Sequence, residues 1–419
     1  MRPRVVIVGA GFAGLYAARA LRHAPVEITV IDRTNHHLFQ PLLYQVATAA
    51  LAPSDITAPI RWLLRHHRNA DVVLGEVTGI DVEARRVAIH GRDTPVSYDY
   101  LILATGSHHA YFGHPDWEPV APGLKSVDDA LEIRGRFLRA FERAEWATEP
   151  AERAAHMTFV VVGGGPTGVE LAGVMPAIAR EALRSNFRYI DTAQTRVILV
   201  EGGDRLLASF PEHLSARAKR DLEDIGVEVR LRSLVSDITP HAVHIGDEWI
   251  DSRTVFWAAG NEASYLGRAL GVPLDGAGRV IVEPDLSIPG HPEVFVAGDL
   301  ADFTHGPKRV PGVCPAAMQQ GVHAANMIVR SLRRQQRKAF RYRNKGDLAT
   351  IGRSRAIADF GSFTMAGRIA WWLWLFLHIL YLAGFRNRLS VLLQWGYAYV
   401  TYERGVRLIT GTERSSASG

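Results

Sequence analysis

The chain has 419 residues, 47% of them hydrophobic, and a single cysteine, Cys314. This length predicts more than one domain, and the apolar fraction is that of a globular protein rather than a disordered one. A lone cysteine excludes an intrachain disulfide and a Cys-x-x-Cys redox pair. The formal net charge of +5 favours an anionic partner, either a nucleic acid or an acidic membrane.

The first predicted unit is a strand, a glycine turn, a helix and a second strand. The apolar strand Arg4 to Val8 enters the turn Gly9-Ala10-Gly11-Phe12-Ala13-Gly14, a helix is predicted over 12–21, and a strand over 27–31 ends at Asp32. Glycines at this spacing let the backbone approach a pyrophosphate, and the helix start points free N–H groups at the phosphates. Asp32 stands where a carboxylate accepts hydrogen bonds from a ribose; a strand-end turn residue is the alternative reading.

A second unit of the same kind follows. The apolar run Phe159 to Val162 enters the turn Gly163-Gly164-Gly165-Pro166-Thr167-Gly168, and a strand over 196–200 ends at Glu201. A carboxylate there favours the free ribose 2′-hydroxyl of NADH over the 2′-phosphate of NADPH, although the nearby Arg205 weakens that preference. One glycine turn is weak support. Two turns, each between a strand and a helix, predict two bound dinucleotides and electron transfer between them.

Later strands return to the first nucleotide. A strand over 100–104 runs into Thr105-Gly106-Ser107, and a strand over 294–296 runs into Ala297-Gly298-Asp299. A first-domain strand that arrives so late implies that the second domain is inserted in the first. The predicted fold is α/β, with two Rossmann-like dinucleotide-binding domains and a C-terminal helical membrane-associating region. The predicted domains are residues 1–112 and 287–340 for the first nucleotide, 113–286 for the second, and 341–419 for the C-terminal region.

The C-terminal part differs in character from the rest. Residues 333–345 are rich in Lys and Arg and contain no acid, which fits either a solvated linker or contact with anionic lipid headgroups. Residues 369–385 are apolar on every helical face and short for a bilayer span, and residues 389–402 add a second apolar segment. We expect monotopic attachment to one leaflet, with His378 as an interfacial anchor or near a substrate headgroup; a buried helix hairpin or a dimer interface is the alternative.

With these features together, the chain resembles the type II NADH:quinone oxidoreductases, a family of flavoproteins with two dinucleotide-binding domains. The resemblance covers nearly the full length. Its most specific stretches are residues 35–47 (Asn-His-His-Leu-Phe-Gln-Pro-Leu-Leu-Tyr-Gln-Val-Ala), 165–170, 297–299, 371–376 and 384–388.

The resemblance implies bound FAD at the first turn and NADH, as substrate, at the second. The residues implied around FAD are Gly9, Gly11, Phe12, Ala13, Gly14, Asp32, Arg33, Gln45, Thr105, Gly106, Asp299 and Ala317. Those implied around NADH are Gly163, Gly165, Pro166, Thr167, Gly168, Glu201, Ala259 and Gly260.

Glu170 and Gln319 are the residues that the resemblance makes catalytic. Glu170 is expected to assist proton movement near the flavin; the alternative is an acid in the first helical turn, stabilised by the helix dipole. The family's Ala-Gln-x-Ala-x-Gln pattern falls on residues 314–319, where Gln319 matches the second glutamine and Pro315 replaces the first. One hydrogen-bond donor to the quinone or flavin is therefore absent. The implied quinone-side residues are Gln40, Pro41, Tyr44, Pro315, Gln319 and Gln320.

The expected function is FAD-dependent oxidation of NADH with two-electron reduction of a membrane quinone, without proton pumping. The expected location is the inner leaflet of the cytoplasmic membrane, on its cytoplasmic face, and an apolar tail of this kind also suits a homodimer. The alternatives are a slow-turnover redox sensor that holds FAD and NADH, or a flavin reductase with another acceptor. No metal site is expected, because the paired histidines have no further ligands at a suitable spacing, and no nucleic acid partner is expected.

Overall fold

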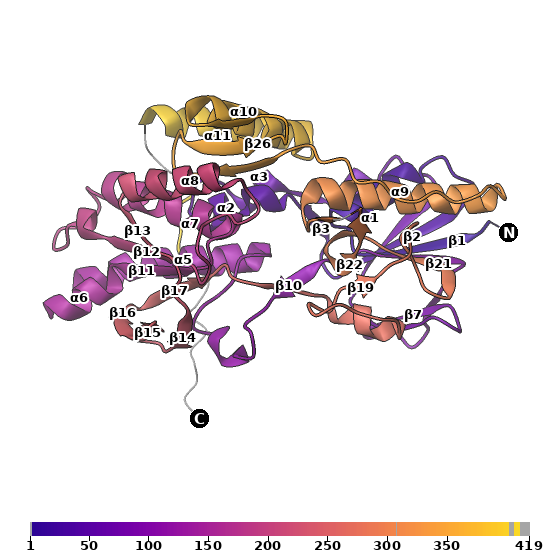
Figure 1. Cartoon of the computed structure of the whole chain (residues 1–419), viewed down its shortest axis with the longest axis horizontal. Coiled ribbons are helices and arrows are strands. Elements are labelled where there is room, and N and C mark those ends of the chain that lie inside the picture. The colour runs from indigo at the N-terminus through magenta and orange to yellow at the C-terminus, as the bar shows by residue number, and fades with distance from the viewer. Residues whose placement is uncertain (1, 307, 402–405, 411–419) are drawn as a thin grey trace. The chain divides into compact units, whose positions relative to one another are not determined.

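The computed structural model describes residues 2–306, 308–401 and 406–410 (Figure 1). The chain forms two compact units, each built from separate stretches of sequence. Unit 1 comprises Met1–Leu38, Thr57–His108 and Asn261–Lys345. Unit 2 comprises Phe39–Ile56, His109–Gly260 and Gly346–Gly419. The inserted arrangement predicted from the sequence is confirmed, because residues 109–260 interrupt unit 1.

Unit 1 is built on a mainly parallel sheet in the order β20–β21–β9–β1–β2–β5. Its strands are β1 (Arg4–Val8), β2 (Glu27–Asp32), β5 (Ala70–Leu74), β9 (Tyr100–Leu103), β20 (Ser287–Ile288) and β21 (His291–Val296). β1 pairs in parallel with β2 and with β9, and β9 with β21. The carboxyl ends of β2, β1, β9 and β21 therefore meet at one edge of the sheet, where nucleotides bind in folds of this kind.

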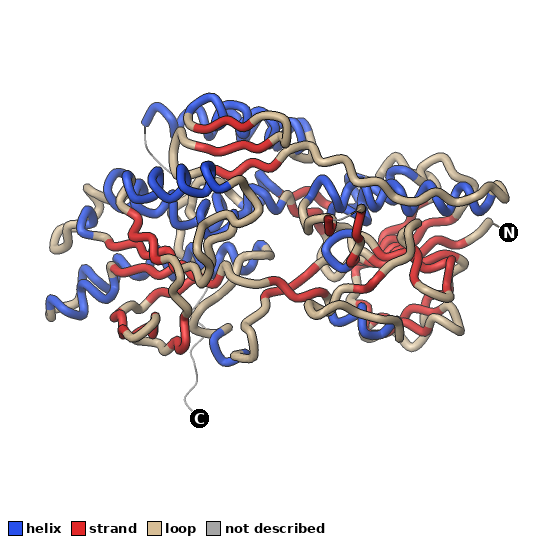
Figure 2. Tube along the Cα trace, viewed as in Figure 1, coloured by secondary structure: helices blue, strands red, loops and turns tan. Residues whose placement is uncertain are grey.

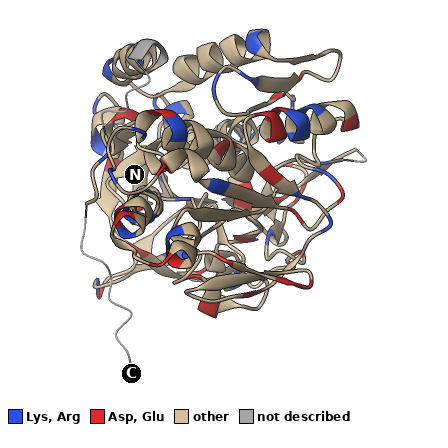
Figure 3. Cartoon of the chain, turned by 90° about the vertical axis from the view of Figure 1, so that its left-hand side faces the viewer, with Lys and Arg blue, Asp and Glu red and all other residues tan. Residues whose placement is uncertain are grey.

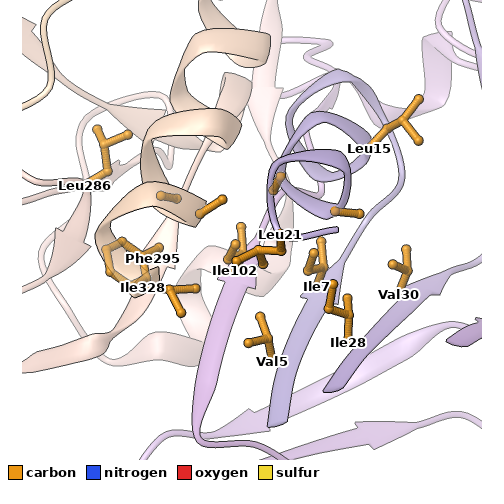
Figure 4. Close-up of a cluster of buried hydrophobic side chains, with 14 of the residues drawn as sticks. Val5, Ile7, Leu15, Leu21, Ile28, Val30, Ile102, Leu286, Phe295 and Ile328 are labelled. Carbon is orange, nitrogen blue, oxygen red and sulfur yellow. The ribbon is translucent and has the colours of Figure 1, made fainter. Parts of the chain in front are cut away.

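Two helices of unit 1 contact each other closely, α1 (Phe12–Ala20) and α9 (Cys314–Leu332) (Figure 1). Gly321 makes this approach possible, because a Cβ there would overlap the carbonyl oxygen of Ala13. Beneath the helices, apolar side chains of the sheet and of both helices form a buried cluster (Figure 4). Val5, Leu15 and Ile328 belong to it. Burying apolar surface stabilises the folded state by about 25 cal/mol per Å², and this contribution holds the layer together.

Shorter elements complete unit 1. An antiparallel sheet contains β6 (Val77–Asp81), β7 (Arg86–Ile89) and β8 (Val96–Ser97). Further short strands are β3 (His36–Leu38), β4 (Thr57–Pro59), β19 (Val280–Ile281), β22 (Ala301–Asp302), β23 (Thr304–His305) and β24 (Lys308–Arg309), and α4 spans Ile60–Leu63. β10 (Ser107–His109) and β18 (Asn261–Ala263) lie where the chain passes between the units.

Unit 2 contains a second parallel sheet in the order β13–β12–β11–β17. Its strands are β11 (Thr158–Val162), β12 (Arg196–Val200), β13 (Val227–Arg230) and β17 (Thr254–Trp257). The antiparallel strands β14 (Val235–Ile238), β15 (Ala242–Ile245) and β16 (Glu248–Asp251) form a separate sheet. The helices before residue 346 are α2 (Leu43–Ala47), α3 (Pro53–Ile56), α5 (Val127–Trp146), α6 (Pro150–His156), α7 (Pro166–Ala177) and α8 (Glu212–Asp224).

The long helix α5 begins with a capping box. Ser126 Oγ accepts the N–H of Asp129 at 3.1 Å, and Asp129 Oδ2 accepts the N–H of Ser126 at 2.9 Å. Each side chain thus satisfies a backbone donor that the first helical turn leaves open. The buried face of the helix includes Ile133, Phe137 and Phe141, whose spacing matches the helical repeat.

The last part of unit 2 contains strands as well as helices. The antiparallel sheet β25 (Asp347–Thr350), β26 (Ala356–Asp359) and β27 (Thr364–Ala366) precedes α10 (Arg368–Tyr381) and α11 (Phe385–Thr401) (Figure 2). The two helices match the two predicted apolar segments, whereas the sheet was not predicted. The second segment was expected to end at Tyr402, which lies outside the described residues. None of the helices in the described ranges has both the length and the apolarity that crossing a membrane requires.

The boundaries of the two compact units differ from the predicted domain boundaries. Residues 261–286, predicted with the second domain, pack in unit 1, where Ala263, Leu266 and Val280 join the core around Val6 and Val8. Residues 39–56, predicted with the first domain, belong to unit 2 together with the C-terminal region. Strand order along the sequence indicates an insertion, but not which sheet a connecting segment covers.

Candidate active site

The glycine turn of unit 1 joins β1 to α1 and is closed on two sides by backbone. Gly9 has φ +96°, and a Cβ on it would overlap the carbonyl oxygen of Ala104. A Cβ on Gly14 would overlap the carbonyl oxygen of Gly9. In contrast, a Cβ on Gly11 would meet no described atom within 4 Å. The outer glycines thus allow the tight turn, and the middle one leaves open the side from which a pyrophosphate approaches.

Asp32, at the end of β2, is bonded to that turn. Its Oδ2 accepts the N–H of Ala10 at 2.6 Å, and its Oδ1 accepts the N–H of Thr34 at 2.7 Å. Of the neighbouring predicted residues, Phe12 and Ala13 are buried at the start of α1 and Arg33 is exposed. The acid therefore has a structural bond as well as the position expected for ribose binding.

The other residues predicted around FAD follow β9 and β21 at the same sheet edge. Gly106 has φ +68°, and Ser107 Oγ donates to Asp299 Oδ2 at 3.0 Å. Thr105 Oγ1 is buried and has no hydrogen-bond partner among the described residues. Buried polar atoms are almost always satisfied, so this hydroxyl fits a site that binds a polar group.

The start of α9 holds the predicted glutamine positions. Gln320 is buried, and its Oε1 accepts the N–H of Gly298 at 2.6 Å. Gln319 Nε2 donates to the carbonyl of Arg343 at 3.0 Å, and its Oε1 accepts the Arg343 N–H at 3.0 Å. Both amides thus make bonds within unit 1, next to the half-buried Pro315 and the buried Ala317.

Cys314 stands at the first position of α9. Burial, with a smaller contribution from the charge of Asp299, raises the pKa of its thiol to about 12. A thiol of this kind remains protonated at neutral pH and is a poor nucleophile.

The glycine turn of unit 2, between β11 and α7, repeats the geometry of the first. Gly163 has φ +111°, and a Cβ on it would overlap the backbone of Ala258. A Cβ on Gly168 would overlap the carbonyl oxygen of Gly163, whereas one on Gly165 would meet no described atom within 4 Å. Pro166 and Thr167 form the first turn of α7. The turn therefore suits a second pyrophosphate.

Glu201 and the segment after β17 complete the predicted NADH residues. Glu201 Oε2 accepts the N–H of Gly164 at 2.6 Å, and its Oε1 accepts the N–H of Gly203 at 2.7 Å. Ala259 and Gly260 follow β17, the neighbour of β11, so they lie at the same sheet edge. Gly260 has φ +74°, and a Cβ there would overlap the ring of Phe112.

The loop predicted at the quinone side belongs to unit 2. Gln40 is exposed and Pro41 half-buried in a 3₁₀ turn, and α2 follows it with Tyr44 and Gln45. Gln45 Nε2 donates to Tyr44 Oη at 3.0 Å, and Gln45 Oε1 accepts the indole N–H of Trp395 at 2.7 Å. Its amide therefore bonds to two side chains of unit 2.

Glu170 lies on α7, beyond the first helical turn, and the residue is half-buried. Burial raises its pKa to about 8, and the N–H of Thr350, 3.5 Å from Oε1, only partly opposes this rise. The helix-dipole alternative requires a position in the first helical turn, and α7 has no acid there. A carboxyl group that stays protonated near neutral pH can act as a general acid.

Sequence reasoning missed Thr350, whose N–H faces Glu170. Tyr44 Oη lies 3.3 Å from Thr350 Oγ1, and Thr350 belongs to β25, in the sheet that was not predicted. Residues 347–350 (Asp-Leu-Ala-Thr) and 356–359 (Ala-Ile-Ala-Asp) show no alternation of apolar and polar residues, so this sheet has no clear local signal in the sequence.

The chain is similar to known proteins in both sequence and fold. The sequence profile described as pyridine nucleotide-disulphide oxidoreductase matches residues 3–321, and the profile described as NDH2 C-terminal domain matches residues 344–401. The type II NADH:quinone oxidoreductase NdhA of Mycobacterium tuberculosis is 45% identical, covering 98% of this chain and 90% of that protein. The type II NADH:quinone oxidoreductase Ndh of the same organism is 44% identical, with the same coverage.

A solved structure also matches over nearly the whole chain. NDH2 from Plasmodium falciparum in complex with NADH has a TM-score of 0.89, covering 98% of this chain and 100% of that one at 20% identity. At this identity the likeness concerns the fold.

The two parallel sheets, each with a glycine turn and an acid at the next strand end, define an oxidoreductase of the pyridine nucleotide-disulphide class. Within that class, the chain belongs to the type II NADH:quinone oxidoreductases, which confirms the resemblance seen in the sequence. As the name of the family states, its reaction is the oxidation of NADH and the reduction of a quinone.

Proposed function

We propose that unit 1 binds FAD at its glycine turn and that unit 2 binds NADH at the equivalent turn. The shared geometry of the two turns is the observation that carries this assignment: the outer glycines are closed by backbone and the middle glycine is open. The unpartnered hydroxyl of Thr105 supports a bound polar group in unit 1. Apart from Gln45, the proposed contact residues are those that the resemblance assigns to each nucleotide.

Two of the predicted residues act indirectly in this proposal. Gln320 holds the N–H of Gly298 and so positions the turn that ends in Asp299. Gln45 joins Tyr44 to Trp395, so it orders the quinone-side loop rather than touching FAD. Gln319, whose amide meets the backbone of Arg343, approaches the quinone only if that bond opens.

NADH rather than NADPH is the proposed nucleotide. The Glu201 carboxylate, already an acceptor for two backbone N–H groups, adds negative charge where a 2′-phosphate would lie. A free 2′-hydroxyl can donate to it instead.

Bound FAD supplies the hydride and electron chemistry. Glu170 holds a proton on its carboxyl group at neutral pH, because burial raises its pKa to about 8. Quinone reduction consumes two protons, and we assign the delivery of one of them to Glu170.

Attachment to a membrane surface is proposed for α10 and α11. Neither helix contains Asp or Glu (Figure 3). Exposed apolar side chains recur along both at the spacing of one helical face. They are Ile369, Trp372, Phe376 and Leu380 on α10, and Phe385, Leu389, Leu392, Leu393 and Tyr397 on α11. An exposed apolar face of this extent fits a lipid interface, with the helices lying in one leaflet.

The proposed surface is the cytoplasmic face of the cytoplasmic membrane, where anionic lipids attract the flanking cations Arg368, Arg386 and Arg388. The quinone reaches the site from this leaflet. The competing explanation for the exposed apolar face is a homodimer formed through it.

The turns can be tested with alanine at the two open glycines. Gly11 and Gly165 have ordinary φ angles and room for a Cβ, so alanine leaves the fold intact but intrudes on a phosphate. We expect Gly11→Ala to lose FAD absorbance and Gly165→Ala to keep FAD but raise the KM for NADH, while Gly276→Ala, an equally open glycine, changes neither. Unchanged FAD content and KM would contradict the assignment.

Anaerobic NADH should bleach the flavin absorbance of the detergent-extracted protein, and a soluble quinone should restore it. Bleaching without recovery would favour the redox sensor or another acceptor. For attachment, Phe376→Glu with Leu393→Glu should abolish flotation with anionic vesicles, while Trp146→Glu, at an exposed tryptophan of α5, should not. If the double variant still floats but a dimer of the wild type becomes monomeric, the face is a protein interface.

A further inference from the structure

A basic surface lies on unit 1 where the end of α1 meets the segment that follows α4. Asn69 joins the two, because its Nδ2 donates to the carbonyls of Leu21 at 3.0 Å and Ala24 at 3.3 Å. Leu21 and Leu64 also belong to the same buried apolar cluster. Exposed basic side chains and a tryptophan surround this contact. We call them the basic patch: Arg19, Arg22, His23, Trp62, Arg65 and His66.

The short helix α4 and the turn after it direct one part of the patch outward. Ile60 and Leu64 are buried in the core of unit 1, whereas Trp62 is 45% exposed and Arg65 is exposed as well. The guanidinium carbon of Arg65 lies 4.1 Å from the centre of the Trp62 ring, and Arg65 Nη1 donates to the Trp62 carbonyl at 2.6 Å. The pair therefore presents an aromatic ring and a positive charge side by side.

The positive charge of the patch is not balanced by acids. Burial, and after it the charges of Arg22 and Arg19, lower the pKa of the half-buried His67. His23 and His66 act in the same direction, so the charged neighbours that act on this ring in the described part of the chain are all basic. The ring's Nδ1 is buried and has no hydrogen-bond partner among the described residues. The patch therefore carries a net positive potential.

The chemistry of the patch restricts its partner. Cations at the end of α1 also stabilise that helix through its dipole, but this effect explains neither Arg65 nor the exposed ring of Trp62. Nucleic acid binding without sequence preference uses several aromatic rings on which successive bases stack, whereas the patch contains one such ring. A half-exposed tryptophan among arginines suits the headgroup level of an anionic bilayer instead.

We propose that the basic patch is a second membrane-contact surface, which binds the headgroups of anionic phospholipids. The inference rests on the proposed attachment through α10 and α11 only for bringing the chain to a bilayer. An apolar segment and a separate basic patch are each weak anchors, and stable attachment combines two such signals. The patch therefore strengthens attachment to anionic bilayers and does not affect attachment to neutral ones.

The test compares bilayers that differ in charge. The FAD-loaded protein is titrated with vesicles of phosphatidylcholine, either alone or mixed with phosphatidylglycerol, and the bound fraction is measured by flotation. The patch variant is Arg22→Gln with Arg65→Gln. The matched control is Arg86→Gln with Arg92→Gln, which changes the net charge equally at two exposed arginines elsewhere in unit 1.

An arginine close to an anionic bilayer strengthens binding by a factor of about five. The patch variant should therefore bind the mixed vesicles roughly 25-fold more weakly than the wild type at low salt, and should bind neutral vesicles equally well. The difference should disappear at about 1 M salt, where the screening length is ~3 Å. The control should bind both kinds of vesicle like the wild type. Equal losses in the two variants would overturn the proposal, because net charge rather than this surface would then be responsible.

Unchanged affinity of the patch variant for mixed vesicles would also overturn the proposal, and a loss of binding to single-stranded DNA in that variant would then assign the patch to nucleic acid. Failure of the attachment through α10 and α11 is distinguishable. Phe376→Glu with Leu393→Glu should lose binding to neutral vesicles, which the patch variant retains. If those helix substitutions leave binding to neutral vesicles unchanged, the helix assignment fails, and the comparison of mixed with neutral vesicles still decides on the patch.

Discussion

Glu201 accepts the backbone N–H of Gly164 at 2.6 Å, so the acid at the end of β12 is bonded to the glycine turn that follows β11. Unit 1 repeats this bond between Asp32 and Ala10, also at 2.6 Å. In both units the acid and the turn come from neighbouring parallel strands, which brings them together at the carboxyl edge of the sheet. Each acid therefore shapes the turn before any nucleotide is bound.

Glu201→Gln should reduce the preference for NADH while preserving the fold. Glutamine keeps an acceptor oxygen for Gly164 but removes the negative charge that opposes a 2′-phosphate. A hydrogen bond to a charged group contributes about 1.5–3 kcal/mol, so kcat/KM for NADH should fall roughly 10-fold or more. The ratio of kcat/KM for NADH to that for NADPH should fall as well. Glu212→Gln, at an exposed acid of α8, is the control; an unchanged ratio in Glu201→Gln would contradict a ribose-binding role.

Glu170→Gln should remove a pH-dependent step from quinone reduction. The pKa of Glu170 is about 8, so the wild-type rate should fall above that pH as the proton is lost. The glutamine variant should be slower by about 100-fold, at the low end for a general acid, and should show no break near pH 8. Flavin reduction by NADH should be unaffected, and Glu181→Gln, an exposed acid just after α7, is the control.

The same substitution has a consequence for stability. Because the folded pKa lies above the unfolded value of 4.5, the native state binds more protons than the unfolded state between these pH values. Stability therefore falls as the pH rises from about 4.5 through 8. Glu170→Gln should not show this loss, so its stability relative to wild type should increase from pH 6 to pH 9. If the stability of the wild type and of Glu170→Gln changed with pH in parallel, the carboxyl group would not be buried in solution.

Local sequence signals were sufficient where strand, turn and helix follow one another directly. The bounds of β1 and β12 agree with the prediction. An apolar run that ends in a glycine turn or an acid is compatible with few structures other than a buried strand. The partners of Gln45 and Glu170 were not predictable in this way. Trp395 lies 350 positions from Gln45 in the sequence, and Thr350 belongs to a sheet whose strands are too short for a clear pattern.

The resemblance assigns residues to positions of the family's motifs but does not describe their bonds. Gln319 occupies the second glutamine position of the family, but nothing in the motif indicates that its amide meets the backbone of Arg343. That bond depends on the path of residues 333–346, which the sequence presents only as a basic stretch. The chemistry of a position therefore follows from its neighbours in space as much as from the motif.

His37 should make unit 1 sensitive to acid. It is 3% exposed, and its Nδ1 lies 2.9 Å from the Ala10 carbonyl, to which the neutral ring donates. Burial lowers its pKa from the ordinary value of 6.5 to about 4, so the unfolded state binds more protons than the native state between these pH values. Stability should therefore be lost as the pH falls from about 6.5 toward 4, by up to about 3 kcal/mol from this residue. His37→Gln should reduce the loss in urea unfolding between pH 7 and 5, compared with His36→Gln; equal losses would contradict the assignment.

Asp55 should be required to hold α11 against the rest of unit 2. The carboxylate is 7% exposed; Oδ1 accepts Ser390 Oγ at 2.9 Å, and Oδ2 accepts Gln394 Nε2 at 3.0 Å. The N–H of Ala52 adds a further bond at 2.8 Å. Asp55→Ala leaves these donors without their acceptor in a largely buried place, which should cost about 1–3 kcal/mol. Denaturant unfolding measures this loss, and Asp116→Ala, at an exposed acid of the same unit, should lose less than about 0.5 kcal/mol.

A double-mutant cycle separates the role of this bond from general damage. If Asp55 acts through α11, Asp55→Ala and Gln394→Ala together should cost less than the sum of the two single changes, because both remove the same bond. Limited proteolysis should then cleave within α11 in either variant sooner than in the wild type. Additive costs with an unchanged cleavage pattern would show that Asp55 stabilises its own short helix and that other contacts, such as that of Trp395 with Gln45, hold α11 in place.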